Sequence, residues 1–216
     1  LQAAQSGKSV IPIFIFDPDE RSIGMAASWW RKQSLSKLDA SLKKIGASLG
    51  FYEGRPLEVL ENLTRFYSAD EIVWNRQYDG YCISRDKEIK QIFSDKGIQC
   101  SSFNASLLFE PWLIKNKSGS FFKVFTPFWR HCLSEYAPES PFPRPTEVRG
   151  HPDKDPFQIQ LPEALLSDDA DLTSDEWTPG EAGAYQQFEK FIEKRLAIYA
   201  EFRDFPDRPA TSRLSP

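Results

Sequence analysis

The sequence predicts an α/β fold with a Rossmann-like, doubly wound parallel sheet, and two observations support this. Short apolar runs alternate with helical patterns of about 10 to 15 residues, which is typical of βαβ units. The first run, Val10–Phe16, is apolar throughout, as expected for a strand buried on both faces of a parallel sheet. With 216 residues, of which 40% are hydrophobic, the chain is long enough to bury a sizeable core.

The elements of the first half follow one another at regular intervals. After Val10–Phe16, apolar residues recur at three- and four-residue spacing from Leu35 to Leu49, which predicts a helix. Further along, the predicted elements are, in chain order, a strand at 48–53, a helix at 57–66 that starts near Pro56, a strand at 71–75, a helix at 89–93 and a strand at 98–103. Parallel strands need crossover connections, so helices are expected on both faces of the sheet.

The second half divides into a helix, a long connection and another helix. Thr126 suits an N-cap and Pro127 the first helical position. The stretch 137–180 holds eight of the 16 prolines and a cluster of acidic residues, which is typical of a connection between domains. A helical pattern resumes after Pro179. We therefore predict an α/β domain at 1–136, a linker at 137–178 and the start of a second domain, which is helical, at 179–216.

Composition limits the functions that the chain can have. A net charge of −4 argues against a chain that binds nucleic acid through an overall basic surface, although a local basic face stays possible. The three cysteines lack metal-ligand spacing and are odd in number, which indicates reduced thiols and a cytoplasmic protein. No apolar run is long enough to cross a membrane, and no nucleotide, hydrolase or metal motif is present. We expect no metal site and a monomer.

Two groups of residues could form binding sites. In parallel sheets, ligands bind at the carboxyl ends of the strands. Those ends carry side chains suited to a planar ligand: Phe16, Asp17, Tyr52, Glu53, Trp74, Asn75 and Arg76. Ordinary loop residues would give the same pattern. Near the other end of the sequence, Thr211, Ser212, Arg213 and Ser215 offer hydroxyls and a guanidinium, which suit a phosphate but could equally cap a helix.

Several motifs, taken together and in order, resemble the DNA photolyase/cryptochrome family. They are FIFDPDE, WWRKQSLSKLDASLKKIGASLGFYEGRPLEVL, VWNRQYDGY, SRD, KVFTPFW, WTPGE, RDFP and TSRLSP. The resemblance covers essentially the whole chain and is greatest to microbial cyclobutane pyrimidine dimer photolyases. It implies a chain truncated at both ends, lacking the first strand of the α/β domain and most of the helical FAD-binding domain.

The resemblance also implies two cofactor sites. It assigns the FAD phosphates to a set of residues in the C-terminal region: Tyr199, Thr211, Ser212, Arg213, Leu214 and Ser215. It places an antenna chromophore, which could be a folate, a deazaflavin or a flavin, in a pocket of the α/β domain. The candidate residues for that pocket are Phe16, Asp17, Trp29, Asn75 and Tyr78.

The function implied by the resemblance is blue-light-driven, FAD-dependent repair of cyclobutane pyrimidine dimers in DNA. The chain would then be part of a deoxyribodipyrimidine photo-lyase, with damaged DNA as the partner of the full-length protein. This fragment alone is expected to be inactive, with no catalytic residue of its own. Two alternatives stay open: a cryptochrome-type photoreceptor, and a chromophore-binding α/β fragment without repair activity.

Overall fold

The computed structural model describes residues 1–135, 140, 142–161, 177–212 and 214. They form two compact units. The first, here called the β3–β4 unit, contains residues 1–8, 17–20 and 54–146. The second, the β1–β2 unit, contains residues 9–16, 21–53 and 147–216. None of the helices in these described ranges is both long and apolar enough to cross a membrane.

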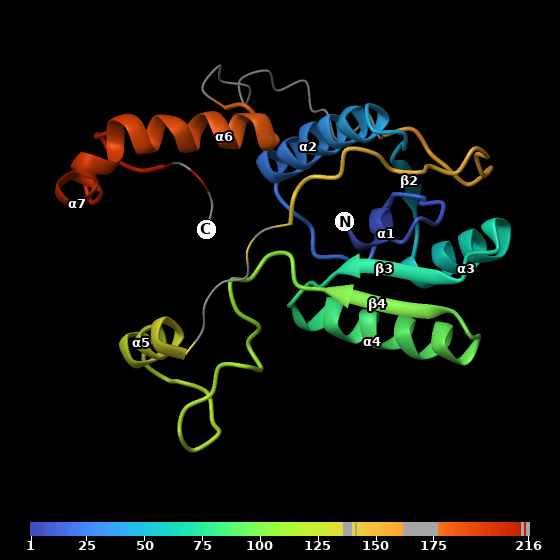
Figure 1. Cartoon of the computed structure of the whole chain (residues 1–216), viewed down its shortest axis with the longest axis horizontal. Coiled ribbons are helices and arrows are strands. Elements are labelled where there is room, and N and C mark those ends of the chain that lie inside the picture. The colour runs from blue at the N-terminus through green and yellow to red at the C-terminus, as the bar shows by residue number, and fades with distance from the viewer. Residues whose placement is uncertain (136–139, 141, 162–176, 213, 215–216) are drawn as a thin grey trace. The chain divides into compact units, whose positions relative to one another are not determined.

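The β3–β4 unit is built on a pair of parallel strands, β3 (Glu71–Asn75) and β4 (Gln99–Phe103), with Val73 opposite Ser101. Helix α3 (Pro56–Tyr67) precedes β3, and helix α4 (Gly80–Asp95) connects the two strands and lies along them (Figure 1). Helix α4 begins where it does because the Asp79 carboxylate accepts a hydrogen bond from the Cys82 amide at 2.9 Å. Phe93 of α4 is completely buried and anchors the helix in the core of the unit.

The remaining helices of this unit are α1 (Gln2–Gln5) and α5 (Phe125–Glu135). Lys8, just after α1, forms an ion pair with Asp70 at 2.9 Å, immediately before β3. Helix α5 follows a long loop and begins at Phe125, one residue before the predicted N-cap, Thr126.

The β1–β2 unit pairs strand β1 (Ile13–Phe16) in parallel with β2 (Gly50–Glu53), with Ile15 opposite Tyr52. Helix α2 (Met25–Lys43) connects them. The core of the unit consists of Leu35, Leu49 and Phe51, with partly buried neighbours at Phe14, Phe16, Leu42, Ile159 and Leu161. Both strand pairs are parallel, so the predicted α/β class with βαβ crossovers is confirmed.

Part of the predicted linker packs onto the β1–β2 unit. Gly150 bridges Val10 in parallel, and Ile159 bridges Phe51 in antiparallel orientation. The Ile159 amide donates a hydrogen bond to the Phe51 carbonyl at 2.9 Å. Residues 147–161, here called the strap, are therefore hydrogen-bonded both to β2 and to the segment that precedes β1.

The structure corrects two details of the sequence prediction. Strand β1 is only partly buried, because among the described residues it pairs along its length with β2 alone. The helix predicted to reach Leu49 ends at Lys43, and Leu38 on its stripe is exposed. Leu49 still joins the core, but it does so from the segment that leads into β2.

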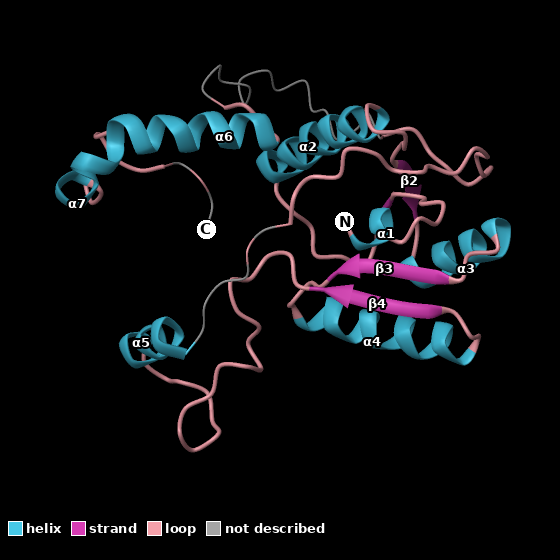
Figure 2. Ribbon diagram, in the orientation of Figure 1, coloured by secondary structure: helices cyan, strands magenta, loops and turns pink. Residues whose placement is uncertain are grey.

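The C-terminal part of the β1–β2 unit is a nearly continuous helical stretch with changing geometry (Figure 2). Helix α6 (Glu181–Lys190) passes into a π-helix, η3 (Phe191–Arg195), then a 3-10 turn, η4 (Leu196–Ile198), and finally α7 (Tyr199–Phe202). Gly180, whose φ of 91° suits glycine, precedes α6, so the helix begins just after Pro179, as the sequence pattern predicts. Single turns of π-helix are frequent at functional sites.

Candidate functional site

The C-terminal candidate site begins at Tyr199, the first residue of α7. Its ring packs edge-on against Phe191 at 5.8 Å between centroids, across the π-helical turn. The Arg203 guanidinium lies 5.7 Å from the same ring, in a cation–π contact. Tyr199 is therefore held by contacts with Phe191 and Arg203, while part of its surface stays open to solvent.

The hydroxyl-bearing residues of the site lie in the segment after α7. Thr211 is exposed, and its carbonyl accepts a hydrogen bond from Arg195 Nη1 at 3.0 Å. The Ser212 hydroxyl accepts a hydrogen bond from the Leu214 amide at 3.2 Å and keeps its own proton to donate. Arg213 and Ser215 of the predicted set lie outside the described residues.

Arg195 and Arg203 were missed in the sequence analysis. They lie four residues before and four residues after Tyr199, a spacing that places side chains on one face of an ordinary helix. That spacing was the available signal. The structure adds that Arg195 connects the helical stretch to the segment at Thr211.

The donors of this segment are of kinds that a pyrophosphate can accept from. Arg195 contacts the Thr211 carbonyl, and Arg203 contacts the Tyr199 ring, so guanidinium groups accompany the residues of the predicted set. Guanidinium and hydroxyl groups are the donors that phosphate oxygens accept from most readily in proteins. Among the described residues of the set, Thr211 and Ser212 supply hydroxyls, and Tyr199 supplies an aromatic surface with a hydroxyl at its edge.

A second polar cluster lies at the carboxyl ends of β3 and β4. Arg76 Nη1 forms an ion pair with Glu110, and Arg76 Nε donates to Ser102 Oγ at 3.1 Å. Tyr78 donates its hydroxyl proton to Glu110 Oε2 at 2.9 Å, and its ring lies 6.2 Å from Trp112. Burial, reinforced by the Glu110 carboxylate, raises the pKa of Tyr78 above its ordinary value.

The third cluster surrounds Asp17, whose side chain is 2% exposed. Tyr81 donates its hydroxyl proton to Asp17 Oδ2 at 2.8 Å, and Arg85 Nη1 lies 3.5 Å from the same oxygen. The other oxygen accepts from the Asp19 amide at 3.0 Å. Partial burial, together with the hydrogen bond to Asp17, raises the pKa of Tyr81 to about 12. Both oxygens of Asp17 are thus engaged within the chain.

The remaining antenna candidates are distributed over the two units. Phe16, at the end of β1, contacts Phe14 edge-on at 5.0 Å and lies 5.7 Å from the Arg31 guanidinium. Trp29 on α2 contacts Trp30 edge-on at 6.1 Å. Both belong to the β1–β2 unit, whereas Asp17, Asn75 and Tyr78 belong to the β3–β4 unit. Asn75 is exposed at the end of β3. The antenna pocket stays a prediction.

Comparison with known proteins places these features in a family. The profile of the family described as DNA photolyase matches residues 1–146. The chain belongs to the DNA photolyase family. Across its whole length it is 39% identical to a deoxyribodipyrimidine photo-lyase of Agrobacterium fabrum, of which it covers 46%. It is also 32% identical to Cryptochrome-1 of Arabidopsis thaliana, of which it covers 33%. The chain thus spans less than half the length of these photolyase-family relatives.

Solved structures of photolyases and cryptochromes agree with the fold. A bacterial class III photolyase from Agrobacterium tumefaciens superposes with a TM-score of 0.93 at 39% identity, over all of this chain and 45% of that one. A cryptochrome from Synechocystis superposes with a TM-score of 0.79 at 19% identity, a likeness of fold alone. The likeness to the Agrobacterium photolyase extends through the strap, α6 and the segment after α7.

Proposed function

We propose that this chain is part of a deoxyribodipyrimidine photo-lyase that repairs cyclobutane pyrimidine dimers in DNA under blue light. The observation that carries the proposal is 39% identity, over the whole chain, to a relative of that name, with a matching fold. The likeness includes the C-terminal segment, where hydroxyl and guanidinium donors suit a dinucleotide's phosphates.

FAD is the cofactor that this proposal requires, and the flavin would supply the light-driven electron transfer when bound. The chain's own contribution is to hold the phosphates. Thr211 and Ser212 would donate hydroxyl protons to phosphate oxygens, and the contact between Arg195 and the Thr211 carbonyl would keep that segment in place. We assign Arg213 and Ser215 to the same role from the resemblance alone.

The proposal also includes an antenna chromophore, damaged DNA as the partner, a monomeric state and a cytoplasmic location. All three cysteines are free, which suits a reducing compartment. The linker at 137–178 and the helical domain start at 179 are part of the same interpretation. The chain would contribute positioning groups and no residue that reacts with the dimer.

The test is light-dependent repair by a protein that carries this chain. Reduced protein is mixed with an oligonucleotide containing one thymine dimer and illuminated with blue light, with a dark sample as the control. We expect the dimer to disappear only in the light. A Thr211→Ala, Ser212→Ala variant should bind less flavin, because two donors to the phosphates are lost. An unrelated surface change, Ser118→Ala, should leave flavin content unchanged.

A cryptochrome-type photoreceptor is the second candidate, favoured by the 32% identity to Cryptochrome-1 of Arabidopsis thaliana. The same experiment separates the two. Stoichiometric flavin with a normal photoreduction spectrum and no dimer repair would replace the photolyase assignment by the cryptochrome one. Absence of flavin from the purified protein would contradict both.

A further inference from the structure

One segment of this acidic chain is locally basic and rich in aromatic residues. Between residues 111 and 134 the sequence has no Asp or Glu, whereas the chain as a whole carries a net charge of −4. Four cations lie in this segment: Lys115, Lys117, Lys123 and Arg130. Six aromatic residues alternate with them: Trp112, Phe121, Phe122, Phe125, Phe128 and Trp129. This composition defines what we call the basic–aromatic segment.

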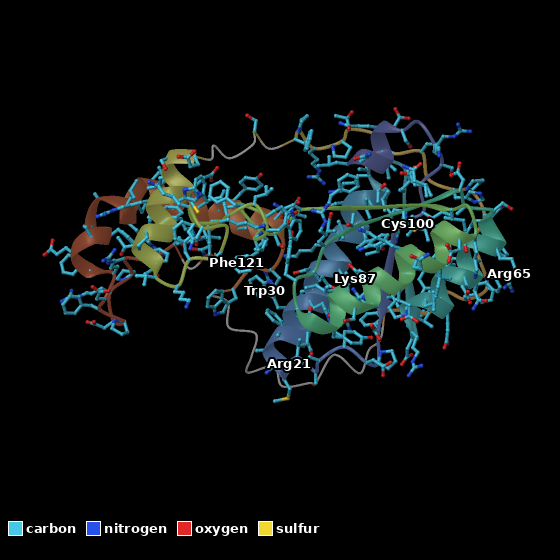
Figure 3. All side chains as sticks on the ribbon, turned by 90° about the horizontal axis from the view of Figure 1, so that it is seen from below. Arg21, Trp30, Arg65, Lys87, Cys100 and Phe121 are labelled. Carbon is cyan, nitrogen blue, oxygen red and sulfur yellow. The ribbon has the colours of Figure 1, made fainter. Side chains whose placement is uncertain are left out.

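Several of these aromatic rings are exposed. Phe121, labelled in Figure 3 on the stretch that leads to α5, is 65% exposed, and Phe125 at the start of α5 is 71% exposed. Phe125 and Trp129, one helical turn apart, are stacked with an interplanar angle of 7° and 6.4 Å between centroids. They form a parallel pair of rings with solvent-exposed surface. Planar ligands such as nucleic-acid bases stack on rings of this kind.

Internal contacts hold the segment in shape. Phe122 packs edge-on against Phe128 at 6.3 Å and lies 5.2 Å from the His131 ring, which attaches the stretch before α5 to the helix. In the preceding loop, Asn116 Oδ1 accepts hydrogen bonds from the amides of Ser118 and Ser120, each at 3.0 Å. The resulting turn carries the exposed Lys115 and Lys117 at its base.

The cations of the segment are available to a partner. Among the described residues, no ion pair involves Lys115, Lys117, Lys123 or Arg130, and all four are exposed. A purely apolar partner surface would desolvate these charges without compensation. A polyanion with planar groups would satisfy both the charges and the rings.

We propose that the basic–aromatic segment, residues 111–134, binds single-stranded nucleic acid. The lysines and Arg130 contact phosphates, and the exposed rings, led by Phe121 and the Phe125–Trp129 pair, stack on bases. This surface is made entirely of residues of the β3–β4 unit, whereas the proposed flavin-phosphate residues belong to the β1–β2 unit. It goes beyond the proposed function, since it requires neither flavin, nor light, nor a DNA lesion.

The test uses the 216-residue chain in the dark, with undamaged, fluorescently labelled oligonucleotides of about 15 nucleotides. Binding of oligo-dT and oligo-U is measured by fluorescence anisotropy between about 50 and 200 mM salt. A duplex of the same length is the third probe. We expect both single strands to bind and the duplex to bind more weakly, because its bases are not free to stack.

Charge-reversal variants locate the binding surface. The triple variant Lys115→Glu, Lys117→Glu, Lys123→Glu should weaken binding at least about tenfold. It should also make the slope of log K against log salt shallower by about 2, since each of three lost phosphate contacts contributes about 0.7. The matched control is Lys44→Glu, Lys87→Glu, Lys154→Glu, which changes the net charge equally at exposed positions outside the segment. Of these control residues, Lys87 lies on α4 (Figure 3). The control should retain most of the affinity.

A second variant tests stacking separately from charge. The double variant Phe121→Ser, Phe125→Ser should weaken binding at least about fivefold. The slope of log K against log salt should stay unchanged, since no phosphate contact is removed. Circular dichroism establishes that each variant is folded. The proposal is overturned if the wild-type chain binds neither oligonucleotide at about 50 mM salt, or if both charge-reversal variants weaken binding equally. Concentration-dependent dimers that Phe125→Ser abolishes, without oligonucleotide binding, would assign the face to a second copy instead.

Discussion

Tyr52 donates its hydroxyl proton to Asp155 Oδ2 at 2.6 Å, and the two residues are 1% and 5% exposed. Tyr52 belongs to β2 and Asp155 to the strap, 103 residues later. The same carboxylate accepts from the Phe157 amide at 2.9 Å and from Gln158 Nε2 at 3.1 Å. A buried carboxylate needs such donors, so this contact fixes the strap against the strand.

Removal of the Tyr52 hydroxyl is expected to destabilise the β1–β2 unit. Tyr52→Phe keeps the ring but deprives the Asp155 carboxylate of a buried donor, which costs about 1–3 kcal/mol in free energy of unfolding. Urea unfolding followed by circular dichroism measures this change. Gln158→Ala removes another donor to the same carboxylate, but the Gln158 side chain is exposed. This change should therefore lower the free energy of unfolding by less. Equal midpoints for wild type and Tyr52→Phe would show that the contact adds no stability.

A close backbone approach between the strap and the loop after α2 leads to the second prediction. A Cβ atom on Gly150 would lie 2.4 Å from the Gly46 carbonyl oxygen and 3.1 Å from Ala47 Cα, both backbone atoms. Gly150→Ala therefore requires the strap to shift, which would strain the Val10–Gly150 bridge. We expect faster hydrogen exchange and faster proteolysis within residues 147–161.

Gly80→Ala is the matched control for that change. Nothing lies within 4 Å of a Cβ at Gly80, the first residue of α4, and alanine favours helix more than glycine does. The control should leave exchange in the strap unchanged. If Gly150→Ala exchanges at the wild-type rate, the strap does not depend on this approach.

Sequence periodicity predicted the strands and the parallel class because apolar runs and helical stripes are local signals. The strap could not be predicted in this way. Asp155 and Ile159 lie in a proline-rich stretch whose composition indicates a linker, and only the tertiary contacts with Tyr52 and Phe51 reveal that it is packed. Composition indicates the conformations that a segment prefers by itself, whereas its packing depends on residues that are distant in sequence.

The candidate site was predictable to a similar extent. Family resemblance pointed to Tyr199, Thr211 and Ser212, and local chemistry agreed with it. The four-residue spacing to Tyr199 could have pointed to Arg195, but its contact with the Thr211 carbonyl was not predictable, because every residue carries a backbone carbonyl. Asp17 was predicted as a pocket residue from its position after a strand. Its hydrogen bonds with Tyr81 and the Asp19 amide depend on the fold and were not predictable.

Cys82 should be unreactive in the folded chain. Burial, assisted by the hydrogen bond with Asp79, raises the pKa of this thiol from 9.0 to about 12. At a given pH below 9 the thiolate, which is the reactive form, is then about a thousandfold rarer than in the unfolded chain. Mass spectrometry after iodoacetamide treatment at about pH 8 measures labelling, with the chain in urea as the control.

The pH dependence of that reaction follows from the direction of the shift. Folding favours the protonated thiol, so its contribution to stability is complete below about pH 9 and is lost as pH rises toward 12. Labelling of Cys82 in the folded chain should increase about tenfold for each pH unit over that range. Native labelling as fast as in urea at pH 8 would contradict the burial of this thiol.

Asp17→Asn is expected to lower the pKa of Tyr81 from about 12 toward its ordinary value of 10.0. The amide carries no charge, so ionised Tyr81 no longer faces a carboxylate, while partial burial, the larger cause of the shift, remains. The pKa should therefore fall without reaching 10.0. Ultraviolet titration measures it as the difference between each chain and the same chain with Tyr81→Phe.

Asp19→Asn provides the control for that titration. Asp19 is more exposed, forms an ion pair with Arg55 at 3.0 Å and contributes less than Asp17 to the Tyr81 shift. Its replacement should move the pKa of Tyr81 only slightly. The dependence of stability on pH provides a further check. A raised tyrosine pKa stabilises the folded chain below pH 10, and this stabilisation is lost as pH rises toward 12. Asp17→Asn should make that alkaline loss smaller and complete at lower pH, because only the folded-state pKa changes. Identical alkaline transitions in wild type and Asp17→Asn would argue that the Asp17–Tyr81 hydrogen bond does not persist in solution.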